Sequence, residues 1–299
     1  MKILITGANG LLGQKLIALL QQQEEIEILA TSRGKSRIKG LDSKYYHTLD
    51  VTSKSAVTEL FNTLQPEVVI HTAAMTQVDD CELNQDECKV ANIEAVRNVV
   101  DGCHAINAHL VHLSTDFIFD GTHGPLAEEA SPKPVNFYGE TKLEAEKIIT
   151  ASGISWAIAR TVLVYGVVSG LSRSNIILWV KDNLEKENTI KVVDDQWRTP
   201  TLAEDLAEGC WLLAKDKVGG VYNISGKDML TPYDMAQMVA EFFSLDKKFI
   251  TRANSSTFSQ PAKRPPKTGF IIDKAFNDIG YTPHSFKEGI KIIADQVKH

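Results

Sequence analysis

Short apolar runs alternate with amphipathic segments along the first half of the chain. The apolar runs have the length of strands and lie at residues 1–6, 26–30, 67–71, 109–114 and 155–160. Apolar residues with helical spacing follow the first run and also fill the interval 87–108. A buried parallel strand is apolar throughout, whereas a helix on its face is apolar on one side only. The alternation predicts an α/β fold with a doubly wound, Rossmann-type parallel sheet.

The second half of the chain alternates less regularly. Helical patterns lie at 175–184, 203–213, 233–243 and 286–297, and strands are predicted at 190–193 and 221–224. We expect a Rossmann domain over 1–165, with 190–225 returning to it. Residues 166–189 and 226–299 are expected to form a smaller α/β substrate lobe over the carboxyl ends of the strands, where such folds bind ligands.

A glycine-rich turn joins the first strand to the first helix. Its glycines are spaced G-x-x-G-x-x-G at Gly7, Gly10 and Gly13. The first permits a tight turn, the second lets a pyrophosphate approach the backbone, and the third lets the helix pack closely on the strand. The helix N-terminus adds free N–H donors for phosphates. We predict a dinucleotide site here rather than an ordinary turn, with further contacts from Asn9, Leu11 and Leu12.

Basic residues follow the second apolar run, where dinucleotide folds hold the adenosine ribose. An NAD site usually has an acidic residue there, about twenty residues after the glycines. This chain instead has Ser32 and Arg33, with Lys35 and Arg37 nearby. A guanidinium suits a 2′-phosphate, and a carboxylate would repel it. The pattern favours NADPH over NADH as the cofactor, with a solvated basic loop as the alternative interpretation.

Composition and charge exclude several classes of function. The chain has 299 residues and a net charge of −6, which argues against non-specific binding to nucleic acid. No apolar run is long enough to cross a membrane, and the N-terminus enters a strand directly, so we expect a cytoplasmic protein. The cysteines lack metal-ligand spacing and are expected to be reduced and mostly buried: Cys81, Cys88, Cys103 and Cys210.

The candidate reactive groups lie in the middle of the chain. Tyr138 and Lys142 are four residues apart in a helical pattern and therefore project from one helix face. A nearby ammonium is expected to lower the pKa of the tyrosine toward neutrality, so that Tyr138 can give a proton to a carbonyl oxygen. Thr115 ends the preceding strand, where its hydroxyl can bond the same oxygen. The alternative is an exposed tyrosine and lysine on an amphipathic helix.

Seven stretches carry a resemblance to a known family. They are T-G-A-N-G-L-L-G, H-T-A-A-M-T-Q-V-D-D-C-E, L-S-T-D-F-I-F-D-G, Y-G-E-T-K-L-E-A-E, A-R-T-V-L-V-Y-G, V-V-D-D-Q-W-R-T-P-T and A-K-R-P-P, beginning at residues 6, 71, 113, 138, 159, 192 and 262. With them the chain resembles the extended short-chain dehydrogenases/reductases, and among these the dTDP-4-dehydrorhamnose reductases. The first and fourth stretches are shared across the superfamily, whereas the third and sixth are much more specific.

The resemblance implies NADPH-dependent reduction of the 4-keto group of a nucleotide-linked deoxysugar. Thr115, Tyr138 and Lys142 match the catalytic trio, and Lys142 also reaches the nicotinamide ribose. Ala73 and Ala74 match residues that line the cofactor groove. The candidates for substrate contacts are Thr76, Asp79, Asp116, Arg198 and Arg264. The alternatives are a helix cap for Asp79 and a salt bridge for each arginine.

Two further cofactor contacts and the partners complete the expectations. Asp50 and Val51 follow the next apolar segment after the basic loop and could flank the adenine. Besides the nucleotide sugar, the expected partner is a second copy of the chain in a homodimer. Some family members use magnesium at a carboxylate-rich contact, but no comparable acidic cluster is found, and no metal is predicted.

Departures from the family pattern bear on the choice of reaction. Leu163 replaces a tryptophan that lies close to the sugar in many relatives, so the substrate could differ. Trp197 replaces a small residue and is either core or a platform for the sugar. Phe117 stands where dehydratases have a glutamate, which disfavours dehydration. The remaining alternatives are a nucleotide-sugar epimerase and a non-catalytic NADP-binding subunit that resembles the regulatory β subunit of methionine adenosyltransferase.

Overall fold

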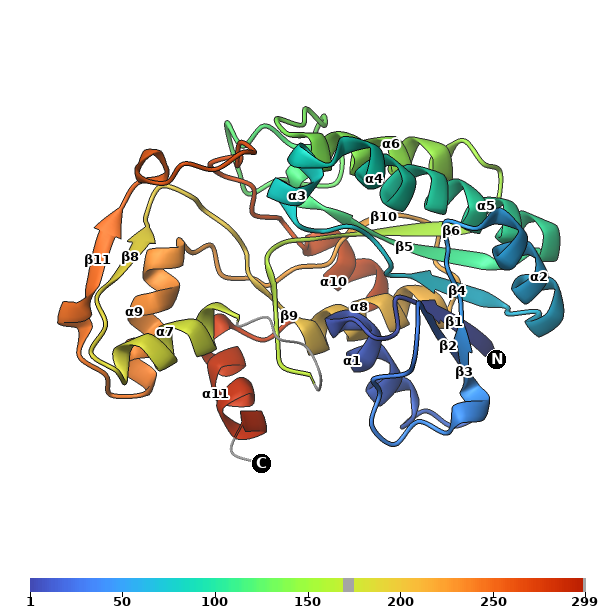
Figure 1. The fold of residues 1–299 in the computed structure, drawn as a ribbon, viewed down its shortest axis with the longest axis horizontal. Coiled ribbons are helices and arrows are strands. Elements are labelled where there is room, and N and C mark those ends of the chain that lie inside the picture. The colour runs from blue at the N-terminus through green and yellow to red at the C-terminus, as the bar shows by residue number, and fades with distance from the viewer. Residues whose placement is uncertain (169–174, 298–299) are drawn as a thin grey trace.

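The centre of the molecule is a seven-stranded parallel sheet in the order β10-β6-β5-β4-β1-β2-β3 (Figure 1). The computed structural model describes residues 1–168 and 175–297. The strands of the sheet are β1 (Lys2–Thr6), β2 (Glu27–Ser32), β3 (Tyr46–Thr48), β4 (Val68–His71), β5 (His109–Thr115), β6 (Trp156–Thr161) and β10 (Gly220–Asn223). The prediction of a doubly wound parallel sheet is confirmed.

Helices cover both faces of this sheet (Figure 1). One face is covered by α2 (Lys54–Leu64), α5 (Ala95–Ile106) and α6 (Phe137–Thr150), whose apolar residues form one core cluster with the strands. The other face is covered by α1 (Leu11–Leu20), α8 (Ala203–Lys215) and α10 (Asp273–Ile279). The inner strands β1, β4, β5 and β6 are therefore buried on both sides, which explains their largely apolar sequences.

The helix expected over 87–108 is divided. It begins earlier, as α4 (Gln85–Lys89), widens into a π-helical turn (Val90–Glu94) and continues as α5. A short helix, α3 (Val78–Leu83), precedes it. The wide turn contains the buried Asn92, whose amide donates to the Met75 carbonyl (3.0 Å) and the Thr141 hydroxyl (3.2 Å). π-Turns of this kind occur often at functional sites.

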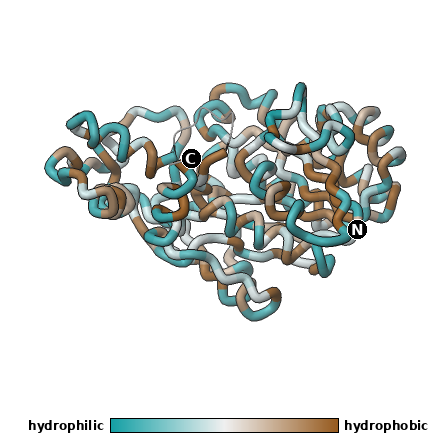
Figure 2. Tube along the Cα trace, turned by 90° about the horizontal axis from the view of Figure 1, so that it is seen from below, coloured by the Kyte–Doolittle hydropathy of each residue, from teal (hydrophilic) through white to brown (hydrophobic). Residues whose placement is uncertain are grey.

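The second lobe lies beside the ends of the central strands (Figure 1). Its core is formed by α7 (Ile176–Leu184), α9 (Pro232–Phe242) and α11 (Phe286–Val297), together with the parallel pair β8 (Ile190–Val193) and β11 (Ile250–Ala253). A second parallel pair, β7 (Val164–Tyr165) and β9 (Thr201–Leu202), joins the lobe to the main sheet. Many of the loops at the outside of the molecule consist of hydrophilic residues (Figure 2).

The course of the chain between the lobes differs in detail from the expected one. Within 190–225, α8 and β10 pack on or join the large sheet, whereas β8 pairs with β11 in the second lobe. Within 226–299, α10 packs on the large sheet. The hydrophobic pattern identifies an element but does not identify its partner strand. Parts of the segments expected in the second lobe, 169–174 and 298–299, lie outside the described residues.

Candidate active site

The glycine turn has two positions that a side chain could not occupy. Gly7 has φ +68°, and a Cβ there would lie 2.9 Å from the backbone nitrogen of Ala73. A Cβ on Gly13 would lie 2.6 Å from the Cα of Ala8, so α1 packs directly on the turn. Gly10 precedes α1 and provides no side-chain cap. The first-turn N–H groups of α1 therefore stay open to an anion.

Four of the predicted cofactor residues lie in the two segments beside this turn. Leu11 and Leu12 begin α1. Ala73 and Ala74 come after the end of β4, which is the neighbouring strand of β1. Because β1 and β4 are parallel neighbours, the segments that follow them emerge at the same edge of the sheet. The close approach of Ala73 to Gly7 therefore places both expected halves of the groove together.

The basic loop after β2 is tied to the glycine turn. The Asn9 amide nitrogen donates to the Lys35 carbonyl (2.9 Å), and the backbone N–H of Arg37 donates to the Asn9 amide oxygen (2.8 Å). Tyr46, which sequence reasoning missed, donates from its hydroxyl to the Gly34 carbonyl (2.8 Å). Ser32 ends β2, and the side chains of Arg33, Lys35 and Arg37 are exposed. The loop can therefore present cations beside the turn.

Asp50 and Val51 lie after β3, near the same loop. The Asp50 carboxylate accepts from the Thr52 hydroxyl (2.7 Å) and from its backbone N–H (3.0 Å), and these bonds, with the charge of Arg33, lower the pKa of Asp50. The Val51 carbonyl accepts from the Asn98 amide (3.0 Å). Both residues are fixed near the basic loop, as a contact with the adenosine half of a dinucleotide would require.

Thr115 and Tyr138 come together where β5 ends and α6 begins. Asn136 caps α6 by accepting from the N–H of Gly139 (2.8 Å), which fixes the helix start beside the strand end. Tyr138 and Thr115 are buried, with 8% and 7% of their surface exposed. Burial raises the pKa of Tyr138, and a hydrogen bond with Thr115 acts in the opposite direction. The predicted pair of hydroxyl groups is therefore present in the fold.

Lys142 does not act on Tyr138 as expected. Its ammonium donates to the Leu113 carbonyl (2.6 Å) and lies 3.1 Å from Nε2 of His112, both on β5. Burial lowers the pKa of Lys142 to about 8. The expected lowering of the pKa of Tyr138 by the lysine is wrong for this structure, because desolvation of the phenol dominates and the ammonium is committed to the strand.

Asp116 and Arg198 form a buried cluster beneath the same strand end. The Thr115 hydroxyl donates to Oδ1 of Asp116 (3.1 Å), the Thr268 hydroxyl donates to Oδ2, and Nε of Arg198 lies 3.7 Å from Oδ2. Burial raises the pKa of Asp116, against the charge of Arg198. Asp116 thus holds the hydroxyl of a candidate catalytic residue.

Arg198 is turned into the protein rather than toward a ligand. Only 5% of its surface is exposed, and its guanidinium donates to the carbonyls of Trp197 (2.8 Å) and Pro265 (2.7 Å). The expectation that it binds a nucleotide diphosphate does not fit this arrangement, because its donors join Asp116 to the loop at 265–266. Sequence spacing carries no information on this inward orientation.

The other proposed substrate residues lie at the boundary between the lobes. Asp79, in the first turn of α3, accepts from both terminal nitrogens of Arg264 (2.7 and 2.6 Å) and from the N–H of Ala262 (3.1 Å). Arg264 therefore forms a salt bridge, which was the alternative interpretation of this arginine. The hydrogen bonds from Arg264 lower the pKa of Asp79. Thr76 is exposed in the loop before α3.

Three departures from the family pattern are located by the fold. Trp197 is 40% exposed and is therefore not a core residue. Leu163 is 45% exposed and has φ +37°, an uncommon conformation for a branched side chain. Phe117 packs edge-on against the ring of Tyr138, with centroids 5.9 Å apart. An apolar ring therefore lies where a dehydratase would have a carboxylate.

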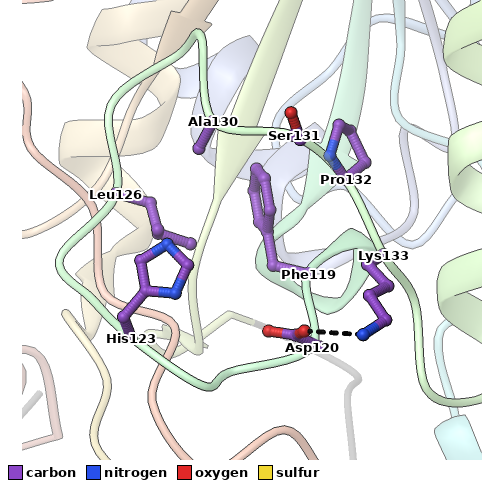
Figure 3. Close-up of a pocket in the computed structure, with 8 residues that line it drawn as sticks. All are labelled: Phe119, Asp120, His123, Leu126, Ala130, Ser131, Pro132 and Lys133. Carbon is purple, nitrogen blue, oxygen red and sulfur yellow. Dashed lines mark ion pairs between the residues drawn. The ribbon is translucent and has the colours of Figure 1, made fainter.

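A cavity of about 440 Å³ lies apart from these groups. It is lined by the loop that follows β5, and Asp120 and Lys133 form an ion pair of 3.5 Å at its rim (Figure 3). None of the predicted site residues lines it.

Over 1–168 and 175–297, no group of three or more His, Cys, Asp or Glu side chains could hold a metal ion. The four cysteines are buried free thiols. In the same ranges, no helix is long and apolar enough to span a membrane.

Comparison with known sequences finds relatives along the whole chain. The family model described as RmlD substrate binding domain matches residues 1–299. The chain is 32% identical to methionine adenosyltransferase 2 subunit beta of Mus musculus, over 97% of this chain and 86% of that protein. It is 30% identical to a dTDP-4-keto-6-deoxy-D-glucose reductase of Streptomyces niveus, over 94% and 91% of the two chains.

Solved structures share the fold. A dTDP-4-dehydrorhamnose reductase from Clostridium acetobutylicum is 31% identical, with a TM-score of 0.88 over 100% of both chains. Another dTDP-4-dehydrorhamnose reductase, from Bacillus anthracis in complex with NADP, is 24% identical, with a TM-score of 0.83 over 99% of each chain. The relatives thus include both reductases and a subunit named for a different enzyme.

Proposed function

The chain belongs to the RmlD substrate binding domain family, and from that premise we propose that it reduces the 4-keto group of a nucleotide-linked deoxysugar with NADPH. The observation that carries the proposal is the convergence of Thr115, Tyr138 and Lys142 at the carboxyl end of β5. This end lies at the same edge of the sheet as the glycine turn. Ligands of doubly wound folds bind at that edge.

The residues around the glycine turn suit a phosphorylated dinucleotide. Gly10 leaves the first turn of α1 without a side-chain cap, and Gly7 brings the backbone close to Ala73. Arg33 is exposed beside this turn, where a 2′-phosphate is favoured by its charge. When bound, NADPH supplies the hydride for the carbonyl carbon.

The chain's own residues then handle the carbonyl oxygen. Tyr138 gives its proton to this oxygen, since the raised pKa keeps the phenol protonated at neutral pH. The Thr115 hydroxyl turns from Asp116 to the same oxygen and stabilises its growing charge. Lys142 holds the nicotinamide ribose with its ammonium, as the resemblance implies. Phe117 offers no base for a second proton transfer, which favours reduction over dehydration.

A non-catalytic subunit is the second candidate, favoured by the 32% identity to the mouse beta subunit over 97% of this chain. The test incubates the purified chain with NADPH and dTDP-4-dehydrorhamnose and follows NADPH absorbance, with a Tyr138→Phe variant as the matched control. We expect NADPH oxidation that the variant lacks. No turnover with this sugar or other 4-keto nucleotide sugars, together with co-purification of a methionine adenosyltransferase catalytic subunit, would favour the second candidate.

A further inference from the structure

The ammonium of Lys142 is held by two acceptors on one strand. It donates to the Leu113 carbonyl (2.6 Å) and lies 3.1 Å from Nε2 of His112, and only 3% of the lysine surface is exposed. An ammonium has three donors and no lone pair, so Nε2 of His112 is the acceptor. The ring is therefore neutral and carries its proton on Nδ1.

His112 makes this contact at a cost to stability. Its Nδ1 is buried and has no hydrogen-bond partner within 1–168 and 175–297. A buried N–H group without a partner is unfavourable, whereas an apolar side chain of similar size would leave no polar atom unpaired. The imidazole is thus a poor choice for packing alone. Its contact with Lys142 is the feature that an apolar residue could not reproduce.

His71 supports the ring of His112 from the neighbouring strand. The two rings stack, with centroids 5.4 Å apart and an angle of 23° between their planes. Oγ1 of Thr6 accepts from the N–H groups of Thr72 (3.2 Å) and Ala73 (3.3 Å). Its own proton is therefore available for Nδ1 of His71, 2.7 Å away. His71 is thereby fixed as a neutral ring, and through Ala73 the network reaches the segment that approaches the glycine turn.

The remaining ionisable groups around Lys142 do not replace His112. The other ionisable groups that act on Lys142 from the packed elements are Cys81 on α3, Cys88 on α4, Glu146 on α6 and His71 on β4. Glu146 favours the charged lysine but is itself paired with Arg160 on β6, at 3.0 and 2.7 Å. Burial and the lysine charge hold the pKa of His112 well below its usual range.

We infer that His112, supported by His71, is a positioning residue that keeps the Lys142 ammonium charged and directed along the end of β5. The consequence for catalysis rests on the proposed function, in which this ammonium lies beside the cofactor. The contact itself does not depend on that function. It can therefore be tested in the full chain without cofactor or substrate.

The test titrates the side-chain nitrogen of Lys142 by NMR in the full chain carrying ¹⁵N-labelled lysine, with a Lys142→Arg variant to identify the signal. The wild-type pKa is expected at about 8. His112→Leu removes the acceptor and should lower this pKa by at least about one unit, since a hydrogen bond to a charged group is worth that much. His112→Gln, whose amide oxygen can reach the place of Nε2, should restore most of the shift.

Melting temperatures separate positioning from packing. His112→Leu removes a buried unpaired donor and should melt at the wild-type temperature or above while the Lys142 pKa falls. If this variant fails to fold, His112→Phe keeps a ring against His71 and replaces it in the test. An unchanged Lys142 titration in the folded variant overturns the inference.

Activity assays on the same proteins keep the two proposals distinct. For an active reductase, the alkaline limb of kcat/KM should shift to lower pH in His112→Leu and return in His112→Gln. An active enzyme whose Lys142 titration does not move retains the proposed function and overturns the inference. A shifted titration in a chain that turns over none of the 4-keto sugars supports the role of His112 and contradicts the reductase.

Discussion

Asp79 and Arg264, 185 positions apart in the sequence, form a bidentate ion pair at the boundary between the lobes. Their side chains are 34% and 17% exposed, and the same carboxylate accepts from the backbone of Ala262. The pair therefore fixes the loop around 262–264 against α3, next to the start of α6. Two parallel hydrogen bonds between a guanidinium and a carboxylate fix the relative orientation of the two groups, which a contact with a single charged atom does not.

Breaking this pair should release the loop. In a double-mutant cycle with Asp79→Asn and Arg264→Gln, we expect a coupling of about 1 kcal/mol in urea unfolding, the upper range for partly exposed pairs. The matched control is Asp194→Asn with Arg252→Gln, an ion pair in the second lobe with a more exposed arginine, where the coupling should be smaller. Additive effects of the two changes at 79 and 264 would contradict a stabilising pair.

Tyr138→Phe should remove the proton donor and little else. The phenol is buried beside Thr115, and the phenyl ring keeps its edge contact with Phe117. We expect kcat to fall at least about a hundredfold, the usual size of a general-acid contribution, with little change in the Kd for NADPH. Steady-state kinetics and a fluorescence titration measure the two quantities. Near-normal turnover would end the assignment of Tyr138.

Arg33→Asp should change the choice of cofactor. The side chain is exposed in the loop that Asn9 ties to the glycine turn, so a carboxylate there repels a 2′-phosphate. We expect the ratio of kcat/KM for NADPH to that for NADH to fall about tenfold or more, the value of one charged hydrogen bond. Lys39→Asp makes the same change of charge further along the loop and serves as control. Equal ratios in both variants would exclude a specific contact of Arg33 with the phosphate.

Acid should destabilise the fold through His71. Burial, helped by the charge of Lys142, lowers its pKa from 6.5 to about 3. The unfolded chain takes up a proton near pH 6.5 and the folded chain does not, so the stability present above pH 6.5 is lost as the pH falls toward 3. At pH 5 the loss from this ring is about 2 kcal/mol.

Urea unfolding at pH 7 and pH 5 measures this loss. His71→Asn should reduce the difference between the two pH values, while the same change at His104, which is exposed on α5, should leave it unchanged. A His71→Asn variant with the full wild-type loss of stability would show that other groups cause the acid sensitivity.

Local signals in the sequence were sufficient for the elements and for part of the site. Strands and helices have different periods, so the apolar runs predict β1, β4, β5 and β6, and the spacing of Tyr138 and Lys142 predicts that they share a helix. The glycine spacing predicts the turn, because only glycine fits against Ala73 and Ala8. The strand β3 and helix α2, whose signals are weaker, were not predicted.

Tertiary structure decided which groups those elements bring together. A hydrophobic period identifies the buried face of an element but not its neighbour, so the pairing of β8 with β11 could not be read from the chain. Nor could the inward turn of Arg198, or the direction of Lys142 toward His112. Burial energies and hydrogen bonds between distant residues set these orientations and pKa values, and they exist only once the chain has folded.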